Sequence, residues 1–127
     1  MAHILIIDDD GSIQLLFKQF LKDKGYSVSS ASDGHKGIAL MKQQKPDLII
    51  TDILMPEMDG LEVICEIKNT HPGLPVIAIS GGMRSGRINF LPHAKTFGAS
   101  RVFEKPVSLA TLLAAVQELL GTPAENK

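Results

Sequence analysis

The segment Ile4-Leu5-Ile6-Ile7-Asp8-Asp9-Asp10 is an apolar run of four residues that ends in three aspartates. Three similar runs also end in reactive groups: 48–51 before Asp52, 76–79 before Ser80 and 101–104 before Lys105. Short apolar runs separated by helix-length segments are typical of buried parallel strands. Ligands bind at the carboxyl ends of such strands, so these polar groups should meet at one sheet edge. Carboxylates suit Mg²⁺, whereas an ammonium and a hydroxyl suit phosphoryl oxygens.

Composition limits the classes of function. The 127 residues fit one domain, and the 44% hydrophobic content is enough for a packed core. The net charge of −1 and the scattered lysines and arginines predict no nucleic-acid partner. The single cysteine, Cys65, excludes an intramolecular disulfide, and we expect it in the core of a helix's apolar face. The first apolar run is too short for a signal peptide or a membrane span, so we expect a cytoplasmic protein without membrane association.

Five strands alternate with helical segments in the predicted pattern. The strands are expected at 3–7, 26–30, 47–51, 76–79 and 101–104, the second being a weakly apolar edge strand. The first helix carries an apolar stripe at Ile13, Leu16, Phe17, Phe20 and Leu21. Helix caps are predicted at Asp10, Asp33 and Ser108, with Gly25 just past the end of the first helix. A glycine-rich stretch at 81–87 is expected to be a loop, followed by a short fourth helix at about 89–97.

This alternation predicts an α/β fold with a five-stranded parallel sheet, five helices and helices on both faces. The pattern by itself leaves the strand order open. Residues 1–121 are expected to form the domain and residues 122–127 a short polar tail, with no output domain.

Each polar group at a strand end also has a simpler explanation. Asp8 and Asp9 repel each other, which a cation would relieve, but an aspartate run can also be a solvated turn. Asp52 can act as a nucleophile toward phosphorus, although a single aspartate after a strand is more often a turn residue. Ser80 can be a cap, and Lys105 a surface lysine, which a cis Pro106 could turn inward. Their joint placement at the ends of four strands favours a functional site.

These motifs together resemble the receiver domain of response regulators, of the stand-alone type. The resemblance covers residues 4–120 and rests on Ile6-Ile7-Asp8-Asp9, the stretch 52–60 (Asp-Ile-Leu-Met-Pro-Glu-Met-Asp-Gly), Ile79-Ser80-Gly81 and Glu104-Lys105-Pro106. It implies a flavodoxin-like doubly wound sheet of order 2-1-3-4-5.

The resemblance also implies the roles of the site residues. Asp52 would be the phosphoacceptor, and Mg²⁺ would be held by Asp9, Asp52 and the backbone carbonyl of Leu54, with Asp8 acting mainly through water. Ser80 and Lys105 would bind the phosphoryl oxygens and report phosphorylation.

Departures from the family pattern concern the read-out. Val102 stands where the family often has an aromatic switch residue, and strand alternation points the neighbouring Phe103 to the opposite face. The segment after Ser80 is long, with Gly81 and Gly82 at its start. We therefore hypothesise that signalling depends on ordering residues 81–87.

The predicted function is a phosphorylation-dependent signalling switch in a two-component system or phosphorelay, not an enzyme with a separate substrate. The implied partners are a sensor histidine kinase or a histidine phosphotransfer protein as donor, and a downstream protein target that the sequence does not name. One alternative is a degenerate receiver acting as a constitutive scaffold. The other is a metal-dependent phosphohydrolase, for which the sequence shows neither a general acid beside Asp52 nor a substrate cap.

Overall fold

The computed structural model describes residues 2–53, 60–80 and 98–121 of the chain. Within them lie five strands: β1 (His3–Ile7), β2 (Ser27–Ala31), β3 (Leu48–Asp52), β4 (Val76–Ser80) and β5 (Arg101–Glu104). They form one parallel sheet of order β2-β1-β3-β4-β5, as the family resemblance implied. The first and fifth strands match their predicted bounds, and the others differ by one residue at one or both ends.

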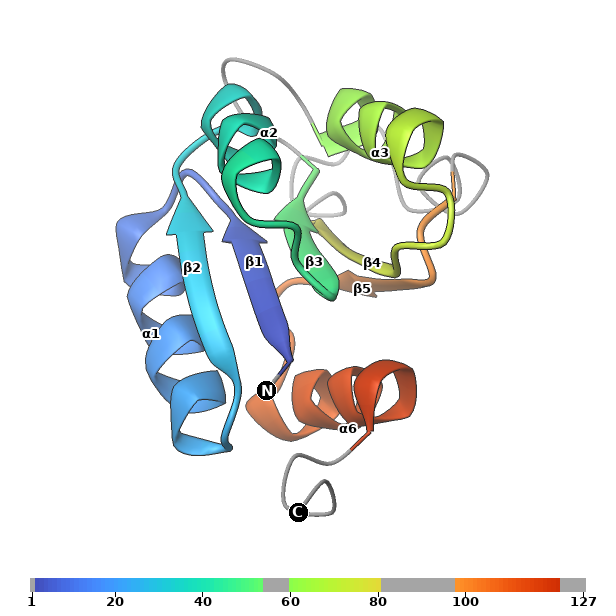
Figure 1. The fold of residues 1–127 in the computed structure, drawn as a ribbon. Helices are drawn as coiled ribbons and strands as arrows, with labels where there is room; N and C mark the ends of the chain where they lie inside the picture. Colours follow the sequence, from blue (N-terminus) through green and yellow to red (C-terminus); the bar gives the residue numbers. More distant parts are fainter. Residues whose placement is uncertain (1, 54–59, 81–97, 122–127) are drawn as a thin grey trace.

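Four helices cover the two faces of this sheet in the described residues: α1 (Gly11–Asp23), α2 (Gly34–Gln43), α3 (Gly60–Thr70) and α6 (Leu109–Leu120). Figure 1 shows α2 and α3 on one face and α1 and α6 on the other. The predicted loop at 81–87 and the predicted short helix at 89–97 lie outside the described residues. None of the described helices is long and apolar enough to cross a membrane.

Local sequence signals explain where the helices begin. The side chain of Asp10 accepts hydrogen bonds from the backbone N–H groups of Ser12 and Ile13, and so caps α1. Asp33 caps α2 and Ser108 caps α6 in the same way. Gly25 follows α1 with a φ of 100°, a left-handed conformation that favours glycine. All four predictions are confirmed.

Two apolar layers hold the helices to the sheet, one on each face. Residues of the interior strand β1 alternate between the two layers: Leu5 and Ile7 belong to the layer under α2 and α3, whereas Ile4 and Ile6 belong to the layer under α1 and α6. All five residues of β1 and of β3 are buried, which explains their nearly continuous apolar sequences. The buried centre of the sheet therefore carries the polar groups that follow these two strands.

One prediction about a buried side chain is wrong, and one residue of a predicted apolar stripe is exposed. Cys65 is exposed because α3 buries the face formed by Val63, Ile64 and Ile67, and the helical period places Cys65 about 150° from the centre of that face. Leu16 belongs to the predicted apolar stripe of α1 but is 48% exposed. The contact face of α1 is narrower than its apolar pattern, with Phe17 and Leu21 at its centre.

Candidate functional site

The turn after β1 brings two carboxylates to the carboxyl end of the sheet. Asp8 is buried, its backbone N–H donates to the carbonyl of Ala31 at 3.1 Å, and its Oδ1 accepts the backbone N–H of Asp10 at 2.9 Å. Asp9 is exposed. The turn therefore fixes one carboxylate inside the molecule and leaves its neighbour at the surface.

Asp52 brings a third carboxylate to the same place. It is the last residue of β3, the strand beside β1, and it is buried. Carboxylate oxygens of Asp8, Asp9 and Asp52 all lie within 4.8 Å of one another. The predicted convergence of these side chains at one sheet edge is thus present in the structure.

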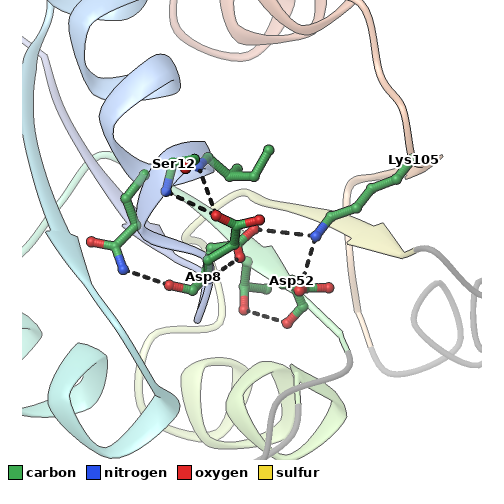
Figure 2. Close-up of polar contacts among 8 residues, drawn as sticks. Asp8, Ser12, Asp52 and Lys105 are labelled. Atoms are coloured by element: carbon green, nitrogen blue, oxygen red, sulfur yellow. Dashed lines mark hydrogen bonds and ion pairs between the residues drawn. The ribbon is translucent and has the colours of Figure 1, made fainter.

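Lys105 reaches this cluster from the end of β5. Its Nζ lies 3.1 Å from Oδ2 of Asp52 and 3.5 Å from Oδ2 of Asp8, and Figure 2 shows the side chain extending toward both carboxylates. The peptide bond between Lys105 and Pro106 is cis, as the sequence suggested. One ammonium therefore bridges the two buried carboxylates.

The charges in this cluster perturb one another. Burial raises the pKa of Asp8, and the negative charge of Asp52 raises it further. The backbone N–H of Asp10 and the ammonium of Lys105 lower this pKa. Burial by itself would lower the pKa of Lys105, but the charges of Asp52 and Asp8 outweigh it and raise that pKa. Lys105 is therefore held in its charged form.

The donor chemistry of the cluster fits a hard divalent cation. Three carboxylates face one ammonium, so the described residues carry an excess of negative charge there. Carboxylate oxygens are the ligands that Mg²⁺ prefers, and it commonly binds through one or two of them. The exposed Asp9 leaves the cluster open to solvent on one side.

The remaining predicted site residues are only partly described. Ser80 is the last residue of β4 and pairs with Glu104 of β5, so its main chain lies at the same sheet edge. Leu54, Gly81 and Gly82 lie outside the described residues. Val102 packs against the apolar layer under α2 and α3, whereas Phe103 packs on the opposite layer, as strand alternation predicted.

Two features of the site were not predicted from the sequence. Gln14 of α1 donates from Nε2 to the main-chain oxygen of Asp8 at 2.6 Å. The tendency of helical side chains to point toward the helix N-terminus could have indicated this contact. The second is a groove of about 400 Å³ beside the cluster, lined by Ile13, Leu16, Phe17, Lys105, Pro106 and Val107.

Comparison with protein families gives a match over nearly the whole domain. The family described as the response regulator receiver domain matches residues 4–117. Among curated proteins, the transcriptional regulatory protein GlrR of Escherichia coli is 35% identical over 97% of this chain, which corresponds to 27% of GlrR. The chain spans between 12% and 50% of the length of curated relatives such as GlrR, the response regulator MprA and the sensor kinase CckA.

Solved structures agree with that match. A response regulator receiver domain protein from Clostridium thermocellum superposes with a TM-score of 0.85 at 28% identity and covers 100% of both chains. The receiver domain of NtrX from Brucella abortus gives a TM-score of 0.84 at 32% identity, covering 94% of this chain and 98% of that one.

Proposed function

Since the chain belongs to the response regulator receiver domain family, we propose that it is a phosphorylation-dependent signalling switch with Asp52 as its phosphoacceptor. Receiver domains are signalling domains and do not turn over a separate substrate. One observation carries the choice of Asp52: its buried carboxylate lies 3.1 Å from the Lys105 ammonium, closer than the 3.5 Å of Asp8, inside a cluster of three carboxylates. That ammonium is placed to donate to phosphoryl oxygens once the group is on Asp52.

The phosphodonor in this proposal is a phosphohistidine on a sensor histidine kinase or a histidine phosphotransfer protein. A carboxylate oxygen of Asp52 attacks phosphorus, an O–P bond forms, and the P–N bond to the imidazole breaks with its electron pair left on nitrogen. In this proposal, the contact of Lys105 with Oδ2 of Asp8 at 3.5 Å keeps its ammonium beside Asp52 during the transfer.

The acidic cluster supplies a place for Mg²⁺ in this reaction. We propose that Asp9 and Asp52 hold it through carboxylate oxygens and Leu54 through its backbone carbonyl, with Asp8 acting mainly through water. When bound, Mg²⁺ offsets negative charge on the transferring phosphoryl group.

The groove beside Lys105 offers a contact surface for the donor protein. Leu16 lines it and is 48% exposed, and the groove is continuous with the acidic cluster through Lys105. Because Lys105 lines the groove and contacts Asp52, a protein that brings a phosphohistidine to Asp52 comes close to this part of the surface. We therefore propose that the donor packs an apolar surface into the groove.

A neighbouring leucine provides a matched control for this contact. Leu16→Ser should slow phosphoryl transfer from a phosphorylated histidine phosphotransfer protein but not from acetyl phosphate. Leu15→Ser should change neither rate, because Leu15 is 63% exposed on the same helix yet does not line the groove. Equal rates for both variants with the protein donor would contradict the proposed contact.

For the read-out, we propose that Ser80 and Lys105 bind the phosphoryl oxygens and transmit the change to β5. Val102 of this strand packs against the apolar layer under α2 and α3. This contact supports transmission of the change through β5 to that layer. Gly81 and Gly82 belong to the same proposal, in which ordering of residues 81–87 accompanies phosphorylation.

Incubation with acetyl phosphate and Mg²⁺, followed by intact-mass measurement, tests the function. We expect a gain of one phosphoryl group that requires Mg²⁺. A folded protein that gains none under these conditions or with a phosphorylated donor protein would instead be a constitutive scaffold. Sustained release of phosphate from sugar phosphates would instead indicate a phosphohydrolase.

A further inference from the structure

The main-chain carbonyl of Asp8 lies just past the last paired residue of β1. The pairing of β1 ends at Ile7, opposite Ala31 in β2 and Thr51 in β3. The amide of Gln14 donates to this carbonyl oxygen at 2.6 Å. That oxygen belongs to the peptide group that joins Asp8 to Asp9. The hydrogen bond therefore restrains the orientation of the peptide group between the two acidic residues.

The start of α1 explains how Gln14 reaches this position. The backbone N–H of Gln14 donates to the carbonyl of Asp10 at 3.0 Å, which places Gln14 in the first turn of the helix. Side chains of a helix lean toward its N-terminus, and here that direction leads back to the turn after β1. The contact thus follows from the cap at Asp10 and from the length of the glutamine side chain.

Asp9 depends on this restraint more than Asp8 does. The Asp8 carboxylate is held directly, by the N–H of Asp10 at 2.9 Å and by Lys105 at 3.5 Å. In the described part of the chain, no hydrogen bond or ion pair holds the carboxylate of Asp9, which is exposed. The position of Asp9 is therefore set by its main chain, and Gln14 holds the peptide that precedes it.

We propose that Gln14 is a positioning residue for the acidic site, one that orients the peptide between Asp8 and Asp9 and so places the Asp9 carboxylate for a divalent cation. This proposal rests on the proposed function for the identity of the cation. Gln14 is uncharged, so it adds nothing to the net charge of the cluster. Its effect on cation binding is therefore geometric rather than electrostatic.

A methionine at position 14 removes the donor while keeping a side chain of similar length and good helix propensity. We expect Gln14→Met to bind Mg²⁺ about tenfold more weakly, at the lower end of the effect of residues that orient metal ligands. The measurements are a Mg²⁺ titration of the metal-free protein and the amide chemical shift of Asp9, which should move before any Mg²⁺ is added. Gln19→Met, at an exposed position of the same helix, should match the parent in both.

The substitution Gln14→Glu distinguishes a geometric effect on Mg²⁺ binding from an electrostatic one. Glutamate has the shape of glutamine but brings an acceptor and a negative charge, so electrostatics alone would tighten Mg²⁺ binding. Positioning predicts that Gln14→Glu displaces the Asp9 amide shift as methionine does and binds Mg²⁺ no more tightly than the parent. Tighter binding with an unchanged Asp9 shift would overturn the proposal.

The Mg²⁺ dependence of the phosphorylation rate is a further measurement, and a purely structural role of Gln14 would leave it unchanged. Phosphorylation of Gln14→Met by acetyl phosphate should need about tenfold more Mg²⁺ for half-maximal rate, yet reach the parent rate at saturation. A variant that loses thermal stability while keeping the parent Mg²⁺ affinity and Asp9 shift would show that Gln14 is only structural. Failure of the parent to bind Mg²⁺ would instead refute the proposed function, and the metal-free Asp9 shift would still test Gln14.

Discussion

The sheet carries buried polar groups at both of its ends, and the two ends satisfy them differently. At the amino end, the two ring nitrogens of His3 share hydrogen bonds with the hydroxyls of Ser27 and Ser29 at 2.8 and 2.9 Å. The backbone N–H of His3 donates to the Asp47 carboxylate at 2.8 Å. At the carboxyl end, Asp8 and Asp52 face each other across a single ammonium.

The amino end matches its donors and acceptors from within the chain. Burial lowers the pKa of His3, against the charge of Asp47, so the ring is held neutral between two hydroxyls. The carboxyl end keeps three carboxylates against one ammonium in the described residues. Such an excess of charge destabilises the metal-free fold and is offset by a cation or altered by a phosphoryl group. The amino end thus satisfies its buried polar groups within the chain, whereas the carboxyl end carries the excess charge on which the proposed phosphoryl transfer depends.

The largest expected difference between the ends is in phosphorylation. Asp52→Asn should abolish Mg²⁺-dependent phosphorylation by acetyl phosphate because the amide is nearly isosteric but a poor nucleophile. Asp47→Asn, at the other end of the sheet, should be phosphorylated to the parent level. Intact-mass measurement gives both results, and full phosphorylation of Asp52→Asn would refute the assignment of Asp52.

Close packing beneath the acidic end gives the largest expected effect on stability. A Cβ at Gly37 of α2 would lie 2.4 Å from Cδ1 and 2.8 Å from Cγ1 of Ile7, the fully buried residue before Asp8. Gly37→Ala should lower the free energy of unfolding by about 1–3 kcal/mol, the usual cost of overpacking. Gly11→Ala is the control, since a Cβ there would have no atom within 4 Å and stability should not fall. Chemical denaturation measures both.

The amino end should respond to loss of hydrogen bonds and to pH. His3→Phe keeps a ring but removes the bonds to Ser27 and Ser29, which should cost about 1–2 kcal/mol of stability at neutral pH. In the parent, His3 protonates at a lower pH in the folded state than in the unfolded chain because its folded-state pKa is lowered. The unfolded chain therefore binds more protons between these two pKa values, and stability rises with pH there.

This pH dependence provides the test. The difference in unfolding free energy between parent and His3→Phe should shrink as the pH falls below about 6.5, the ordinary histidine value. A difference that stays constant from neutral to acidic pH would contradict the description of His3 as a buried neutral ring.

The smallest expected effect has the opposite sign and belongs to the carboxyl end. Asp8→Asn should stabilise the metal-free protein because it removes a buried carboxylate whose pKa is raised. The folded parent takes up a proton on Asp8 at a higher pH than the unfolded chain does, so the gain should shrink as the pH falls through that raised pKa. Thermal unfolding without metal at several pH values tests this. Destabilisation by Asp8→Asn at neutral pH would show that the ion pair with Lys105 outweighs the cost of burial.

Local sequence signals were enough to predict much of this site. The apolar runs located β1 and β3, and the aspartates at their ends were therefore expected at one edge. For Gln14 the sequence offered only the general lean of helical side chains toward the helix N-terminus, because its partner is a main-chain oxygen whose position depends on the turn after β1. The role of His3 was equally hidden, since its serine partners lie 24 and 26 residues away in the chain.

The amino-acid sequence by itself determined the alternation of strands and helices, the caps at Asp10, Asp33 and Ser108, and the polar residues at the strand ends. These features depend on burial period and on contacts between residues close in the chain, both of which can be read from neighbours. Only the tertiary structure decided which side of each helix meets the sheet, and so left Cys65 and Leu16 exposed. It also decided that Lys105 lies between Asp8 and Asp52, because the distances among these residues depend on how separate strands align.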